Sequence, residues 1–280
     1  KLNSFTVKVG YPDKWRDYSG LVIDPAKSLY ENLRIASKFI SKQRQDEKVG
    51  KPVDRDEWHM TPQTVNAYYN PTTNEICFPA GILQYPFFDP EADDAFNYGA
   101  IGVVIGHEMT HGFDDQGCHF DKNGNMTEWW TKEDTENFAK LGEYYADFFS
   151  KIEVLPGLNA NGKMTLGENI ADHGGLMVAY QAFKNAEAEA MKVNKKVAMA
   201  NAGKKLGLTA DQRFFCAYSG VWGQNITEKE IRNRVLNDVH SLGEWRVKGA
   251  LPHIDAWYKA FNIKPSDPLY IAPDKRLRLW

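Results

Sequence analysis

Hydrophobic residues recur at helical spacing in several segments of the chain. After Pro25, four apolar residues follow one another at intervals of three or four positions: Leu29, Leu33, Ala36 and Ile40. This spacing places them on one face of a helix. We expect further helices over residues 138–152, 169–189 and 228–238, and a solvated helical face or loop over residues 184–205, which are rich in Lys and Ala. The pattern therefore predicts a chain with much helix.

Short strand-like segments lie in the first third of the chain. Residues 5–9 have this character, and residues 64–69 (Thr-Val-Asn-Ala-Tyr-Tyr) predict a strand that ends at Asn70-Pro71. Residues 75–78 are expected to form its short partner. Residues 86–97 contain prolines and several acids, and we expect them to form a loop. A small sheet is therefore expected beside the helices.

The composition is that of an ordinary globular protein. Of the 280 residues, 42% are hydrophobic and 25% are charged, and the formal net charge is −3. This balance is unsuited to broad nucleic-acid binding or to a polybasic membrane anchor, and no apolar stretch is long enough to span a bilayer. We therefore expect neither nucleic acid nor a membrane to contact this segment. The chain opens at Lys1 without a signal-peptide pattern, so we expect it to be part of a longer protein.

Three cysteines, Cys77, Cys118 and Cys216, lie far apart in the sequence. There is no C-x-x-C pair, which excludes a cysteine-based zinc knuckle, and no base in the sequence marks one of them as a nucleophile. A chain of this size does not need disulfides to stabilise its core. We therefore expect three buried free thiols.

The strongest chemical signal is the segment from His107 to His111, which follows an apolar run and matches the pattern H-E-x-x-H. Two histidines four residues apart lie on one face of a helix, so both imidazoles can reach one metal ion. Neutral imidazole is a good zinc ligand. Glu108 lies to the side of this pair, where a general base for metal-bound water is needed. The alternative is a helix with two ordinary histidines and a glutamate.

A catalytic zinc ion needs a third protein ligand and an open position. The extended pattern H-E-x-x-H-x-x-G-x-x-H is absent, so the third ligand must come from elsewhere, and Glu168 is the best candidate. Asp172 lies four residues later on the same helix face and can hold the free ring nitrogen of a zinc-bound histidine. Asp114 can do the same for His111. The alternatives are two surface carboxylates on a helix, and a solvated helix end at Asp114.

Several blocks of sequence can be compared with known families. They are Asn66-Ala67-Tyr68-Tyr69, residues 78–84, residues 107–115, residues 167–172, and Val239-His240-Ser241 followed by Arg246, with Trp280 at the end. In order and spacing these blocks closely resemble the neprilysin and endothelin-converting-enzyme family of zinc endopeptidases, over roughly residues 50–280. Arg276 or its neighbour and Gly223 stand where animal members carry cysteines. The chain is therefore most similar to bacterial members of the oligopeptidase O type.

This resemblance implies a role for each residue of a catalytic site. One zinc ion per chain would be bound by three side chains: His107, His111 and Glu168. Glu108 would activate the water, and Asp172 and Asp114 would orient the two histidines. His240 would donate a hydrogen bond to the oxyanion of the tetrahedral intermediate, and Arg246 would bind a substrate carbonyl.

The resemblance also implies how a peptide would bind. Asn66 and Ala67 would contact the peptide backbone, with their strand adding to the extended substrate. An apolar pocket would accept a large residue just after the cut bond, and its walls would be Ile82, Phe87, Val103, Val104, Val221 and Trp222. The implied activity is hydrolysis of oligopeptides on the amino side of large apolar residues, by Glu-assisted attack of zinc-bound water.

The fold implied by the resemblance is α+β and mostly helical, a thermolysin-like zincin catalytic domain with a small sheet. Residues 63–280 would form this domain, and residues 1–62 would be the end of a preceding lobe and a connecting segment. Whole family members are more than twice as long, and their first part is a helical lobe that caps the cleft, so this lobe is an expected partner. For the parent chain, we favour a periplasmic, secreted or cell-surface location over a cytoplasmic one.

Two other functions stay open at this point. One is a catalytically inert zinc- and peptide-binding fragment that lacks its cap lobe. The other is a different zinc hydrolase with the same metal geometry, such as an aminopeptidase, although the sequence contains no acidic motif that would bind a free amino terminus.

Overall fold

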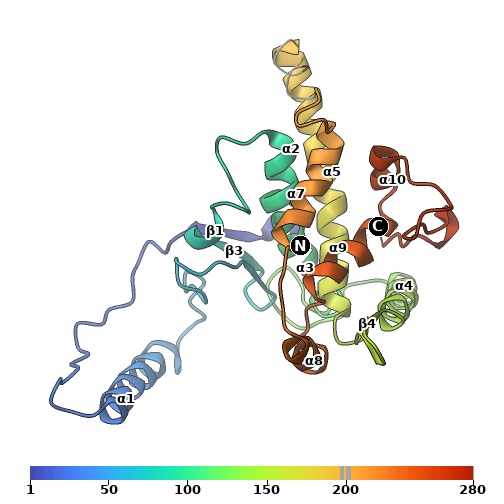
Figure 1. Ribbon diagram of the computed structural model, residues 1–280. Helices are drawn as coiled ribbons and strands as arrows, with labels where there is room; N and C mark the ends of the chain where they lie inside the picture. The colour runs from blue at the N-terminus through green and yellow to red at the C-terminus, as the bar shows by residue number, and fades with distance from the viewer. Residues whose placement is uncertain (196–198, 200–202, 280) are drawn as a thin grey trace.

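The computed structural model describes residues 1–195, 199 and 203–279. Helices are the main secondary structure of the described chain, with two small sheets at their sides (Figure 1). The helices are α1 (Leu29–Lys48), α2 (Asp94–Asn97), α3 (Val103–His111), α4 (Lys132–Ser150), α5 (Leu166–Val193), α7 (Ala210–Val221), α8 (Glu228–Asn237), α9 (Gly243–Ala250) and α10 (Asp255–Phe261). The strands are β1 (Thr6–Gly10), β2 (Tyr68–Asn70), β3 (Glu75–Pro79), β4 (Glu153–Leu155) and β5 (Leu158–Asn159). The α+β, mostly helical fold predicted from the sequence is confirmed.

The helices predicted from hydrophobic spacing are present. Helices α1, α4, α5 and α8 cover most of the residues predicted to be helical, although α4 starts six residues earlier than expected, at Lys132. The predicted loop over residues 86–97 is wrong at its end, where α2 forms because Asp93 accepts a hydrogen bond from the backbone N–H of Phe96 and caps the helix. Part of the predicted stretch 184–205 belongs to α5, and residues 196–198 and 200–202 lie outside the described residues.

The three-stranded sheet has the order β1-β3-β2, so β2 is at its edge. Strand β3 pairs in parallel with β1 and antiparallel with β2, where Tyr68 faces Cys77 and Asn70 faces Glu75. The predicted strand 64–69 is wrong over residues 64–67, because β2 begins only at Tyr68. Continuing the register would place Asn66 opposite Pro79, which has no N–H to donate, and residues 64–65 opposite the 3-10 helix that follows it.

Helix α1 stands away from the rest of the molecule at the lower left of Figure 1. None of its residues is buried, and its apolar face is largely exposed, with Leu29 at 76% and Leu33 at 56%. By contrast β1, which also belongs to residues 1–62, pairs with β3. The predicted domain boundary at residue 62 stays a prediction.

Helices α3 and α5 pack closely against each other and hold the centre of the molecule together. A single π-helical turn, Tyr98–Gly102, leads into α3 and contacts α7, and its residues Gly99, Ala100 and Ile101 are buried. The largest apolar cluster lies where α5, α7 and α10 meet, and includes Phe183, Phe214, Phe215 and Trp257. The cluster also includes Val103 of α3 and Leu176 of α5, so it ties the α3–α5 pair to the carboxyl-terminal helices.

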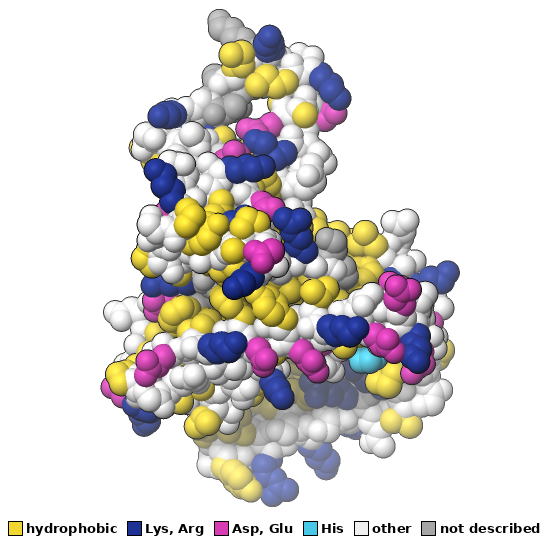
Figure 2. All heavy atoms as spheres, turned by 90° about the vertical axis from the view of Figure 1, so that its right-hand side faces the viewer, with side chains coloured by type: hydrophobic (Ala, Val, Ile, Leu, Met, Phe, Trp, Pro, Cys, Tyr) yellow, Lys and Arg dark blue, Asp and Glu magenta, His cyan; other side chains and the backbone are white. Residues whose placement is uncertain are grey.

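The surface mixes both charge signs. On the face shown in Figure 2, basic and acidic side chains lie next to one another around a band of hydrophobic side chains. Among the described helices, none has the length and apolar character needed to cross a membrane.

All three cysteines are free thiols, as predicted, but only Cys77 is buried. Cys118 is half-buried, and the expectation of a buried thiol is wrong for Cys216, which is exposed on α7. The buried side chains of α7 lie on its other faces, including Phe214, Phe215 and Tyr218.

The end of the described chain is fixed through a buried histidine. Leu277 is 1% exposed, and its backbone N–H donates a 2.9 Å hydrogen bond to Nδ1 of His253. Burial, and to a lesser extent the nearby Arg276 charge, lower the pKa of His253 to about 4. Tyr145 and His173, which are also buried, pack against its ring.

This histidine predicts a pH dependence of stability. An unfolded histidine has a pKa of about 6.5, so between pH 6.5 and 4 the unfolded chain binds a proton that the folded chain does not bind. We expect the free energy of unfolding to decrease over this window as the pH falls, by up to about 3 kcal/mol from His253. His253→Asn keeps an acceptor but does not titrate, so urea unfolding at pH 7 and pH 5 should show a smaller difference in this variant. An equal difference in both proteins would contradict the prediction.

Candidate metal centre

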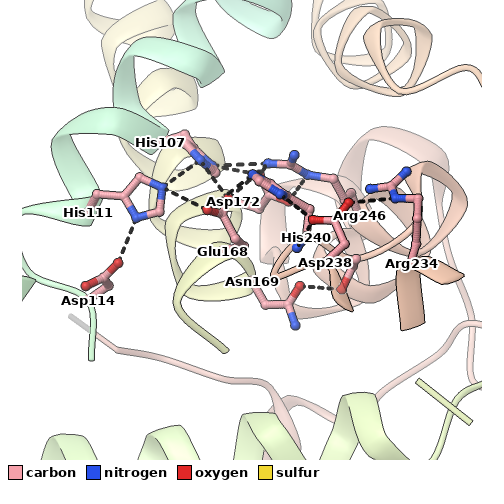
Figure 3. A network of polar contacts seen from close by, with 11 residues as sticks. His107, His111, Asp114, Glu168, Asn169, Asp172, Arg234, Asp238, His240 and Arg246 are labelled. Carbon is pink, nitrogen blue, oxygen red and sulfur yellow. Dashed lines mark hydrogen bonds and ion pairs between the residues drawn. The ribbon is translucent and has the colours of Figure 1, made fainter. Parts of the chain in front are cut away.

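Helices α3 and α5 bring three candidate metal ligands together (Figure 3). His107 and His111 project from successive turns of α3, and their Nε2 atoms are 2.9 Å apart. Glu168, from the first turn of α5, faces both rings, with Oε2 at 3.2 Å from Nε2 of His107 and Oε1 at 3.6 Å from Nε2 of His111. One ligand atom from each of the three side chains lies within 4.8 Å of the others.

Each histidine ring contacts one carboxylate on the side that faces away from the other ligands. Nδ1 of His107 lies 2.9 Å from Oδ1 of Asp172, and Nδ1 of His111 lies 2.7 Å from Oδ2 of Asp114. A carboxylate can only accept, so each Nδ1 carries the hydrogen. In a neutral ring the Nε2 lone pair then points at the other histidine and at Glu168.

This donor set fits a metal cation. Two imidazole lone pairs face each other at 2.9 Å, and Oε2 of Glu168 is buried without a hydrogen-bond partner. A cation among these atoms would satisfy all of them, and two histidines with one glutamate are a recurring ligand set for catalytic zinc. His107, His111 and Glu168 therefore form a group that could hold a metal ion.

Burial and the nearby charges shift the pKa values of Glu108 and Glu168 in opposite directions. Burial alone would raise the pKa of Glu168, but its close contact with His107 and the positive charge that His107, His111 and His240 carry when protonated hold it well below its usual range. Burial raises the pKa of Glu108, which is 6% exposed and lies beside the two histidines. A buried carboxylate with a raised pKa is better suited to accept and return a proton near neutral pH.

His240 approaches the same glutamate from the segment between α8 and α9. Its Nε2 is 3.3 Å from Oε1 of Glu168, and its Nδ1 lies 2.8 Å from Oδ1 of Asp238. Arg234 in turn donates a 2.7 Å hydrogen bond to the other oxygen of Asp238. The ring of His240 is therefore oriented by Asp238, and its Nε2 is directed into the site (Figure 3).

Arg246 is buried and binds Asp172 through two hydrogen bonds. Its Nε donates to Oδ2 at 2.7 Å and its Nη2 to Oδ1 at 2.6 Å, while the guanidinium lies 3.6 Å from the ring centroid of Trp222. Asp172 therefore accepts from both His107 and Arg246. The role of Arg246 in binding a substrate carbonyl stays a prediction.

A cavity of about 400 Å³ opens beside these residues. Its lining contains all sixteen side chains that the sequence predicted for catalysis, metal binding and substrate binding, from Asn66 and Ala67 on one wall to Val221 and Trp222 on another. The structure thus brings the predicted residues to one place, while their individual roles stay predictions.

The sequence analysis missed several residues of this site. Asp238 orients His240, and the only signal was its position two residues before that histidine. Additional residues line the cavity: Val65, Tyr68, Tyr69, Pro71, Ala100, Gln116, Gly117 and Tyr218. Tyr68 and Tyr69 stood inside one of the recognised sequence blocks, whereas nothing in the sequence marked Tyr218 or Gln116.

Comparisons with known proteins agree with this geometry. The model of peptidase family M13 matches residues 66–277. The chain is 37% identical over 287 residues to neprilysin-3 of Drosophila melanogaster, covering 100% of this chain and 35% of that protein. It is 38% identical to a neutral endopeptidase of Lactobacillus helveticus, covering 100% of this chain and 40% of that protein.

A solved structure also matches. The zinc metalloprotease Zmp1 of Mycobacterium tuberculosis, in complex with an inhibitor, superimposes with a TM-score of 0.90 at 44% identity, over 99% of this chain and 41% of that one. The chain thus spans well under half the length of the relatives it matches. On the family model, the sequence identities and the shared fold together, the chain belongs to peptidase family M13.

Proposed function

We propose that this chain is the catalytic part of a zinc-dependent endopeptidase that cleaves oligopeptides on the amino side of large apolar residues. The observation that carries the proposal is the convergence of His107, His111 and Glu168 beside the buried Glu108, on the wall of a cavity large enough for peptide side chains. The names of its relatives, among them a neutral endopeptidase and a zinc metalloprotease, support the same activity.

Each residue of the site would have a separate role in hydrolysis. One zinc ion, held by His107, His111 and Glu168, would supply Lewis acidity for the substrate carbonyl and for the attacking water. Glu108 would accept a proton from that water and return it to the leaving amine, because its buried carboxylate has a raised pKa. His240 would donate a hydrogen bond to the carbonyl oxygen as negative charge develops there.

Substrate binding would use the edge of the sheet and the apolar wall of the cavity. Asn66 and Ala67 immediately precede the edge strand β2, so an extended peptide could add its backbone beside them. The side chain after the cut bond would enter between the predicted apolar walls, all of which line the cavity: Ile82, Phe87, Val103, Val104, Val221 and Trp222. None of these six side chains carries a charge, which favours a large apolar residue there.

The length of the relatives supports one further partner, an amino-terminal lobe of the parent protein. They are more than twice as long as this chain, so an amino-terminal helical lobe would cover the cavity in the parent protein. The exposed apolar residues of α1 support this proposal, because they offer a surface on which another part of the chain could pack. For the parent protein we also keep the proposal of a location outside the cytoplasm.

The test is cleavage of a short quenched-fluorescence peptide with Phe or Leu after the scissile bond. We expect cleavage at that bond, loss of activity with a zinc chelator and recovery with added zinc. A matched peptide with Asp after the bond should be cleaved much more slowly. Stoichiometric zinc binding without any cleavage would instead support the alternative, an inert zinc- and peptide-binding fragment.

The contact between Asp238 and His240 gives a further prediction. Asp238→Asn removes the charge that orients the ring, and we expect kcat to fall roughly tenfold with little change in KM, since a charged hydrogen bond contributes about 1.5 kcal/mol. Glu244→Gln serves as the control, because Glu244 is exposed and forms an ion pair with exposed Lys248 in the next turn of its helix. An unchanged kcat in Asp238→Asn would show that His240 does not need this carboxylate.

A further inference from the structure

Helices α3 and α5 meet at two glycines, directly beside the metal ligands. A Cβ atom added to Gly175 would lie 2.7 Å from the carbonyl oxygen of Val103 and 2.8 Å from the backbone nitrogen of His107. A Cβ atom added to Gly106 would lie 2.9 Å from both Cα and the carbonyl oxygen of Gly175. Real Cβ atoms essentially never come this close to other heavy atoms, so no other residue fits either position without moving a helix.

Gly175 lies on the helix face that carries the site, and Gly106 is the direct neighbour of a candidate ligand. On α5, Glu168, Asp172 and Gly175 are separated by four and three residues and share one face. On α3, Gly106 directly precedes His107, and the backbone that Gly175 touches is that of His107 itself. The closest approach of the two backbones is therefore within one turn of the His107–Asp172 hydrogen bond.

The neighbouring Gly174 shows a different kind of contact. A Cβ atom there would meet the side chain of Thr110, at 2.5 Å from Oγ1 and 2.6 Å from Cγ2. Truncating Thr110 would remove both of these atoms and leave its Cβ at 3.1 Å. A clash at Gly174 is thus reduced to one tight contact of 3.1 Å by changing one side chain, whereas a clash at Gly175 is with backbone and can be relieved only by separating the helices.

We propose that Gly106 and Gly175 are positioning residues of the metal centre: their contact sets the distance between α3 and α5 at which Glu168 and Asp172 reach His107 and His111. The helices would pack without glycine, because a larger residue would only increase their separation. The ligand set would not tolerate this, since Glu168 and Asp172 are joined to the histidines by contacts of 2.9 to 3.6 Å. This inference rests on the proposed zinc site.

The test compares Gly175→Ala with the double variant Gly174→Ala/Thr110→Ala in the 280-residue chain. Both place alanine at adjacent positions of α5, where alanine is the better helix former. We expect Gly175→Ala to bind zinc at least tenfold more weakly in a chelator competition, the range found when groups supporting metal ligands are lost. We also expect the visible spectrum of bound Co²⁺ to change, because the ligands no longer sit at the same positions. The double variant should retain both properties of the parent.

Loss of general stability is controlled by Leu279→Ala, which opens a cavity in a separate apolar cluster. This variant should lower the melting temperature but keep the Co²⁺ spectrum of its folded molecules. If Gly175→Ala cannot be recovered folded, Gly106→Ala, with its longer closest approach of 2.9 Å, carries the same comparison. Zinc affinity and a Co²⁺ spectrum equal to those of the parent would overturn the inference, whereas a parent chain that binds no zinc would overturn the proposed site itself.

Discussion

Replacement of Glu108 by glutamine is expected to reduce peptide hydrolysis by a factor of 10² to 10⁴ or more, the range that general acid–base catalysis contributes. Glutamine has nearly the same shape but cannot accept a proton at neutral pH. Glu108 is not among the three grouped ligands, so the zinc content measured by atomic absorption should stay at that of the parent. The loss should therefore appear in kcat, with zinc still bound.

Asp115→Asn is a suitable comparison for this experiment. Asp115 is also an acid with a raised pKa, caused first by burial, and it lies on the same segment of the chain, but it does not line the cavity. It should keep most of the activity. Full hydrolysis by Glu108→Gln would show that another group is the base.

Glu168→Ala is expected to lower the zinc content of the purified chain sharply, together with all activity. Two histidines remain in this variant, but the third ligand of the proposed site is gone, and the carboxylate that faces both rings at 3.2 and 3.6 Å is lost. Two ligands from adjacent helical turns bind zinc far more weakly than three. The measurement is the metal content after dialysis, compared with that of the parent.

Glu143→Ala is the matched control, since Glu143 is an exposed helical glutamate of α4. It should leave the zinc content unchanged. A zinc content of Glu168→Ala equal to that of the parent would exclude Glu168 as a ligand, and Asp172 would then be the next carboxylate to test.

The sequence was most informative where a helix has one apolar and one polar face. The apolar positions of α1 and α4 repeat with the period of a helix, and both helices were predicted. Helix α5 was also predicted, although residues 169–176 are all buried and it has no clear polar face there. Helix α7 was not predicted, although its buried residues Ala210, Phe214 and Tyr218 recur at helical spacing on one face. The exposed side carries Cys216 and Gly220, so the contrast between its two faces is weak. Helices α9 and α10 have only eight and seven residues, too few for a repeat to show.

The metal-binding residues could be predicted because they lie in pairs that are close together in the sequence. The pair His107 and His111 lies within one turn, and Glu168 and Asp172 lie within another. Contacts between distant segments could not be inferred in this way. The double hydrogen bond between Arg246 and Asp172 joins residues 74 positions apart, and the close approach of Gly106 to Gly175 depends on how two helices cross. Such contacts depend on tertiary packing, which hydrophobic spacing does not determine.

Asp172 links the metal-binding part of the site, at His107, thermodynamically to Arg246, because both residues share its carboxylate. One of its oxygens accepts from His107, and both accept from Arg246, so the negative charge that each partner experiences depends on the other. A ligand that draws the guanidinium of Arg246 toward itself would leave more of that charge to the imidazole and strengthen its donation to a cation. By reciprocity, a bound cation would then favour the ligand by the same factor. We therefore expect the metal affinity of this chain to differ between the form with a ligand in the cavity and the form without one.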